Sequence, residues 1–190
     1  MMNGRKITLC ALWLLVGVCA QASEMSRKLQ ASEHVLLMRH TLAPGVGDPA
    51  GYALNDCKTQ RNLSAQGRKQ ASVVGAWLKK QGVTAAEVYT SAWCRCQDTA
   101  KLLDFGSVQV EPALASFFDE MHQAKERTTS LKQLIADKLK TKGDKALILV
   151  THHVNIQDYA GENIASGDMV LARVGADGQL LSYKLIPRPD

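Results

Sequence analysis

Short apolar runs alternate along this chain with longer segments in which apolar residues recur at helical spacing. Four of the runs predict buried strands, at residues 35–38, 87–91, 108–110 and 146–150. Helical spacing of apolar residues predicts three helices: one from Ser64 to just before Gly82, one over 97–103, and one around 131–139. Two further apolar runs, 169–174 and 180–185, flank the turn signal 176–179 and predict a hairpin.

This alternation of strands and helices is typical of α/β proteins. We therefore expect a three-layer sandwich, with a mostly parallel central sheet, helices on both faces and a C-terminal hairpin. Residues 23–33 are polar and predict a loose lead-in. Residues 41–61 are rich in Pro and Gly and show little periodicity. A loop of this length in a compact domain is usually functional.

The first 22 of the 190 residues form a separate unit. Arg5 and Lys6 provide a basic head, residues 7–19 are apolar, and Ala20-Gln21-Ala22 has the small-x-small form of a cleavage site. This arrangement predicts a secretory signal peptide over 1–22 and a single domain over 23–190. The apolar run is too short to predict a stable membrane span. We expect a periplasmic or secreted protein.

Removal of Arg5 and Lys6 with this segment lowers the formal net charge from +5 to +3, with 21 basic residues against 18 acidic ones. Such a mild excess favours anionic ligands. It gives no reason to expect nucleic acid as a partner.

Chemistry-bearing residues follow three of the predicted strands. The strands end in Arg39-His40, in Ser91 with Arg95 shortly after it, and in Thr151-His152. If the strands are parallel, these residues meet at one edge of the sheet, where ligands of open α/β sheets bind. Arginine matches phosphate oxygens and stays charged, and a neutral imidazole can attack phosphorus. The sequence therefore predicts a phosphate site, with neighbouring arginines keeping the attacking histidine neutral.

The same residues resemble the motifs of the histidine phosphatase superfamily, in its phosphoglycerate-mutase-like branch. The matching segments occur in the family's order and span most of residues 23–190: Arg39-His40, Leu63-Ser64-Ala65-Gln66-Gly67, Ser91 to Ala100, and Thr151-His152. The resemblance implies the α/β sandwich described above. It also implies phosphoryl transfer through a covalent phosphohistidine, without metal or cofactor.

The resemblance also implies roles for single residues. His40 would be the nucleophile, and Arg39, Arg95 and His152 would complete the phosphate pocket. Arg61 resembles an arginine of the small members of the family and is a further candidate for phosphate binding; the alternative is a solvated charge at a helix start.

The chain departs from the family pattern at several positions. Thr41 and His153 replace glycines, which predicts a bulkier rim, and Ala92 replaces a proline. Ser116 stands where many members have a general-acid carboxylate. Two neighbouring acids, Asp119 and Glu120, could supply the proton instead; Glu120 is the marginal choice, and an exposed acidic turn is the alternative.

These observations predict a metal-independent phosphomonoester hydrolase of the cell envelope. The substrate could be a phosphorylated small molecule, a glycolipid or a phosphoprotein. A mutase of the same chemistry and a catalytically silent protein that binds a phosphorylated ligand are the alternatives. A metal site is not expected, because the spacing of His152-His153 and Cys94-x-Cys96 fits no standard zinc pattern.

Three cysteines, Cys57, Cys94 and Cys96, follow the predicted signal peptide. An oxidising compartment favours one disulfide and one remaining thiol. A Cys94–Cys96 bridge would close a very tight ring, so we expect Cys57 to pair with one of the other two. The sequence does not decide between them; Cys94 is the marginal choice, and three unpaired thiols are the alternative.

Overall fold

The computed structural model describes residues 23–190, and the predicted signal peptide lies outside them. The described part of the chain has a six-stranded sheet in the order β3-β2-β4-β1-β5-β6. Its strands are β1 (His34–Arg39), β2 (Ala86–Thr90), β3 (Val108–Val110), β4 (Ala146–Thr151), β5 (Met169–Val174) and β6 (Leu180–Ile186). Every pairing among β1, β2, β3 and β4 is parallel, whereas β5 pairs antiparallel with β1 and β6. The mostly parallel sheet and the C-terminal hairpin are thus confirmed.

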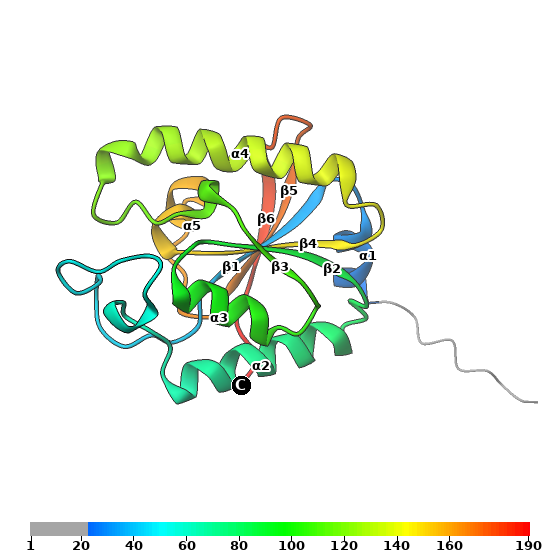
Figure 1. The fold of residues 1–190 in the computed structure, drawn as a ribbon. Helices are drawn as coiled ribbons and strands as arrows, with labels where there is room; N and C mark the ends of the chain where they lie inside the picture. The colour runs from blue at the N-terminus through cyan, green and yellow to red at the C-terminus, as the bar shows by residue number, and fades with distance from the viewer. Residues whose placement is uncertain (1–22) are drawn as a thin grey trace, which may run out of the picture.

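Helices cover both faces of this sheet (Figure 1). The helices are α1 (Glu24–Gln30), α2 (Ala65–Lys80), α3 (Cys94–Leu102), α4 (Ala124–Thr141) and α5 (His153–Ala160), with short 3₁₀ turns η1 (Cys57–Thr59), η2 (Pro112–Leu114) and η3 (Met121–Gln123). Successive strand residues alternate between two apolar cores, because side chains of a strand point to opposite faces. Val35 and Leu37 pack with α4 and α5 in one core, whereas Leu36 and Met38 pack with α1, α2 and α3 in the other.

The N-terminal segment differs from the prediction. Residues 24–30 form α1 rather than a loose lead-in. Ser23 caps this helix by accepting from the Ser26 N–H, and Leu29 is fully buried in the core. Lys142, which is itself buried, donates from Nζ to the Leu29 and Gln30 carbonyls. The helix is therefore held by distant contacts that short-range periodicity does not reveal.

Two helix boundaries near the sheet edge also differ from the prediction. α3 begins at Cys94, three residues earlier than expected, so that Arg95 lies in its first turn. α5 follows β4 directly and places His153 at its first position. The segment 153–160 gave no helical signal strong enough to predict it. Both helices begin where their strands end, which brings their first turns to the same edge of the sheet.

The start of α2 is placed by a close approach to the segment after β1. Ser64 caps the helix as predicted, with its Oγ accepting from the Gly67 N–H. A Cβ atom at Gly67 would lie 2.1 Å from the Leu42 carbonyl oxygen, so only glycine fits there. The close contact fixes the start of α2 against the residues that follow His40.

No helix in residues 23–190 is long and apolar enough to cross a membrane.

Candidate active site

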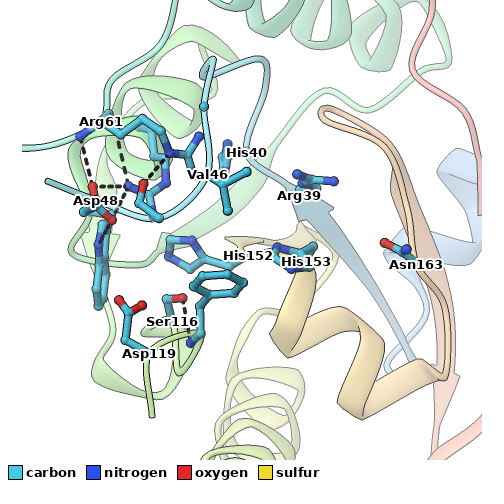
Figure 2. Close-up of a pocket in the computed structure, with 15 residues that line it drawn as sticks. Arg39, His40, Val46, Asp48, Arg61, Ser116, Asp119, His152, His153 and Asn163 are labelled. Carbon is cyan, nitrogen blue, oxygen red and sulfur yellow. Dashed lines mark hydrogen bonds and ion pairs between the residues drawn. The ribbon is translucent and has the colours of Figure 1, made fainter. Parts of the chain in front are cut away.

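A cavity of about 290 Å³ opens at the carboxyl ends of β1, β2 and β4. The register of the sheet explains why residues distant in sequence meet there: Arg39 lies beside Thr151, and Thr90 beside Val150. In Figure 2, His40, His152 and His153 lie between Asp48 on one side and Asn163 on the other. The cavity is lined by Arg39, His40, Gly45, Val46, Gly47, Asp48, Arg61, Trp93, Arg95, Ser116, Phe118, Asp119, His152, His153 and Asn163.

His40 lies at the base of this cavity and is only 2% exposed. Its Nδ1 is 2.8 Å from the Thr41 carbonyl oxygen. Because a carbonyl can only accept, Nδ1 carries the proton, and Nε2 keeps its lone pair. Burial lowers the pKa of His40 to about 3, and the charges of Arg95 and the other arginines act in the same direction. His40 is therefore neutral near pH 7 and has the tautomer that a nucleophile requires.

His152 is the second buried histidine of the cavity. Its ring centroid is 5.6 Å from that of His40, at an interplanar angle of 71°. Its Nε2 lies 2.8 Å from Ser91 Oγ, and the ring also contacts Trp93. Burial holds the pKa of His152 well below its ordinary value, and the neighbouring His40 and Arg95 add to the effect. His152 is therefore neutral near pH 7.

Three arginines carry the positive charge of the cavity. Arg39 donates from Nη1 to the Ile164 carbonyl at 2.7 Å. Arg61 donates from Nε to the Gly47 carbonyl and from Nη1 to the Ala43 carbonyl, which ties it to the loop after β1. Burial lowers the pKa values of Arg39 and Arg61, but from a value so high that both remain cations near neutral pH. All three predicted arginines therefore line one cavity with His40 and His152.

Asp48 is a member of the site that sequence reasoning missed. Its carboxylate accepts from Arg95 Nη1 at 2.9 and 3.0 Å. The Asp48 and Arg95 side chains are 3% and 4% exposed. In the sequence, Asp48 is marked only as an acid within the Gly/Pro-rich loop at residues 41–61. That signal is too weak to single out one residue.

The two candidate acids after η2 differ in whether they line the cavity. Asp119 lines the cavity together with Ser116 and Phe118, and Figure 2 shows Asp119 and Ser116 beside the histidines. Both acids are exposed, but Glu120, the marginal choice from the sequence, is not among the lining residues. Of these two acids, the geometry therefore favours Asp119.

The two replacements of glycine also behave differently. His153 lines the cavity, where its ring lies 5.7 Å from that of Phe118, and so narrows the rim as expected. Thr41 does not line it: its hydroxyl lies 3.1 Å from Thr99 Oγ1, and its N–H donates to the same oxygen. Thr41 therefore joins the end of β1 to α3 instead of adding bulk to the rim, which corrects that expectation.

The disulfide joins Cys57 to Cys94, the pairing marginally preferred from the sequence. Cys96 is free and fully buried, with its Sγ 3.5 Å from His152 Nε2. Burial raises the pKa of the Cys96 thiol to about 12, so it stays protonated. The bridge fastens the loop after β1 to the first turn of α3, the turn that carries Arg95.

Metal ligands are not clustered in this part of the molecule. Residues 23–190 contain no group of three or more His, Cys, Asp or Glu side chains arranged to hold a metal ion. The ionisable groups of the cavity are three arginines, three histidines and two carboxylates. This combination can bind a phosphate and present a neutral imidazole to it.

The fold is an α/β protein with a mostly parallel sheet, and the arginine–histidine cavity at the ends of its strands has the chemistry that phosphate binding requires. A family model of the histidine phosphatase superfamily (branch 1) matches residues 35–133, more than half of the chain. The chain belongs to this superfamily, which confirms the resemblance and supports phosphatase or mutase chemistry. A search of curated proteins found no similar sequence.

Solved structures share the fold. The mycobacterial glucosyl-3-phosphoglycerate phosphatase is 15% identical, with a TM-score of 0.59 over 83% of this chain and 99% of its own. The protein histidine phosphatase SixA, complexed with tungstate, is 19% identical, with a TM-score of 0.53 over 80% and 94%. A phosphoserine phosphatase from Entamoeba histolytica is 15% identical, with a TM-score of 0.57 over 79% and 95%.

Proposed function

We propose that this protein is a phosphomonoester hydrolase that works through a phosphohistidine on His40, without a metal ion. The observation that carries the proposal is the state of His40. It is a buried, neutral imidazole whose proton is held on Nδ1 by the Thr41 carbonyl, in a cavity lined by three arginines. An uncharged Nε2 beside cations that attract phosphate is the arrangement that attack on phosphorus requires.

In the first step, the lone pair of His40 Nε2 forms a bond to phosphorus, and the bond from phosphorus to the leaving oxygen breaks. The imidazole becomes cationic and keeps its Nδ1 proton, which the Thr41 carbonyl stabilises. In the second step, a water oxygen attacks phosphorus and the P–N bond breaks. Phosphate leaves and His40 returns to its neutral form.

Proton transfer to the leaving oxygen falls to Asp119 in this proposal. It is the acid at the cavity that is not paired with an arginine, since Asp48 is held by Arg95. As a carboxylic acid, Asp119 would protonate the leaving oxygen, and as a carboxylate it would take a proton from the attacking water. His152 would donate one N–H to a phosphate oxygen.

The cavity volume of about 290 Å³ suits a phosphorylated small molecule. The glycolipid and phosphoprotein substrates predicted as alternatives would place most of their bulk outside it. A location in the cell envelope is supported by the sequence of residues 1–22 and is compatible with the disulfide. Export away from glycolytic intermediates argues for a hydrolase over a mutase.

The test is hydrolysis of p-nitrophenyl phosphate by purified protein comprising residues 23–190, with and without a chelator. We expect turnover that the chelator does not change, that is lost in His40→Ala, and that is retained in His122→Ala, which alters an exposed histidine outside the cavity. Loss of turnover with the chelator would contradict the metal-independent mechanism. Phosphate binding without turnover would favour the silent alternative.

A further inference from the structure

The Asp48 carboxylate accepts hydrogen bonds from three residues that line the cavity. One carboxylate oxygen accepts from the Arg61 backbone N–H at 2.9 Å, and the other accepts from Trp93 Nε1 at 3.1 Å. Both oxygens accept from Arg95 Nη1. All three partner residues line the cavity, so this one carboxylate joins the loop after β1 to the first turn of α3 (Figure 2).

The contact leaves a defined part of Arg95 free. Nη1 is engaged by Asp48, whereas Nε is buried and has no hydrogen-bond partner in the described residues. Arg39 shows the same pattern, with Nη1 held by the Ile164 carbonyl and a buried Nε without a partner in residues 23–190. Nε and Nη2 form the edge of a guanidinium that binds two phosphate oxygens at once. Each arginine is thus anchored through one nitrogen and keeps its bidentate edge for a ligand.

We propose that Asp48 is a positioning residue, which fixes Arg95 so that its Nε–Nη2 edge is presented to the phosphate of the substrate. The inference rests on the proposed function and extends it to a residue that touches no reacting atom. Asp48 also offsets one of the three positive charges that the arginines bring to the cavity.

Asp48 stays ionised in this role. Burial alone would raise its pKa, but the hydrogen bonds from Arg95 and from the Arg61 N–H outweigh burial and lower it. The carboxylate is therefore a permanent charge in the site. With Arg95 present it is neutralised; without Arg95 it would repel phosphate.

The opposite effects of Asp48 with and without Arg95 provide the test. Four proteins are compared on p-nitrophenyl phosphate: wild type, Asp48→Asn, Arg95→Ala and the double variant. We expect Asp48→Asn alone to lower kcat at least tenfold, because Arg95 is no longer held in the geometry that the transition state requires. KM should change less than threefold, because the loss of a negative charge favours phosphate binding and offsets the weaker hold of Arg95. In the Arg95→Ala background, Asp48→Asn should raise kcat/KM at least threefold.

Two results would overturn the proposal. If Asp48→Asn lowers kcat/KM by the same factor in both backgrounds, Asp48 acts independently of Arg95, as a general structural residue would. If Asp48→Asn raises kcat/KM in the wild-type background, Asp48 competes with phosphate for Arg95 rather than positioning it. Asp98→Asn is the matched control, because Asp98 lies on α3 with Arg95 but outside the cavity, where it pairs with Arg68 of α2 at 2.7 Å. It should leave both parameters unchanged.

A binding measurement separates this inference from the proposed function. Calorimetric titration with inorganic phosphate needs no turnover, so it applies even if the protein proves to be catalytically silent. Arg95→Ala should weaken phosphate binding at least tenfold, and adding Asp48→Asn should restore part of the affinity. No gain in affinity on adding Asp48→Asn would overturn the proposal, whether or not wild type hydrolyses the ester.

Discussion

The Cys57–Cys94 bridge closes a loop with a sequence separation of 37 residues. We expect the double variant Cys57→Ala/Cys94→Ala to fold and to be less stable than wild type. In the chain-entropy model, a closed loop of this length contributes about 4 kcal/mol by restricting the unfolded chain. For a domain of this size, such a loss lowers the Tm by about 8–16 °C.

Activity should survive this loss at temperatures well below the Tm. The loop keeps other attachments to α3, among them the Asp48–Arg95 ion pair and the hydrogen bond from the Cys94 N–H to Gln60 Oε1. We therefore expect kcat/KM on p-nitrophenyl phosphate to fall less than fivefold in the double variant. The bridge would then act mainly on stability, with the ion pair maintaining the geometry of Arg95.

The assay is urea unfolding of wild type and the double variant, each with and without dithiothreitol. Wild type should lose stability on reduction, and the double variant should not respond. A difference below about 1 kcal/mol between oxidised wild type and the variant would refute the loop-entropy reasoning. Peptide mapping without reductant provides the covalent check, since three alkylatable thiols in secreted protein would show that the bridge does not form.

Three further predictions concern single groups. Arg95→Ala should lower kcat/KM by about 30- to 1,000-fold, because it removes about 2–4 kcal/mol of charge-assisted binding; a loss below threefold would show that Arg95 does not bind phosphate. In the folded protein the pKa of His40 is about 3, whereas in the unfolded chain it has its ordinary value of 6.5. Once the pH falls below 6.5, the unfolded chain therefore takes up a proton that the folded protein does not, and this favours unfolding. Between pH 6 and 5, wild type should therefore lose about 1 kcal/mol more unfolding free energy than His40→Asn, and equal losses in urea titrations would contradict this burial. Lys142→Met should lower the unfolding free energy by about 2–4 kcal/mol, because the three N–H groups of Lys142 Nζ are shared among four backbone carbonyls within hydrogen-bond distance. The exposed control Lys140→Met should change the unfolding free energy by less than about 0.5 kcal/mol.

The sequence predicts those parts of the site that follow regular strands. β1 and β4 are uninterrupted apolar runs, so their ends could be located, and with them Arg39-His40 and His152. Parallel strands then bring these ends together without any knowledge of side-chain contacts. The same reasoning placed Arg95 after β2.

The rest depends on contacts that have no period in the sequence. Asp48 lies in a loop, and its importance comes from Arg95, Trp93 and Arg61, which are distant along the chain. The choice between Asp119 and Glu120 depends on the course of an irregular turn. The choice between Cys94 and Cys96 depends on where α3 begins, because residues two apart on a helix face different directions.

The most direct test of the proposed mechanism is to trap the phosphoenzyme. Wild type and His40→Ala would be mixed with a phosphate-labelled ester and quenched within milliseconds in alkaline denaturant, and the labelled peptides would be mapped. The mechanism predicts an acid-labile, alkali-stable phosphate on the peptide that contains His40 in wild type, and no labelled peptide in His40→Ala. Phosphate on another residue, or hydrolysis by His40→Ala at near the wild-type rate, would contradict it.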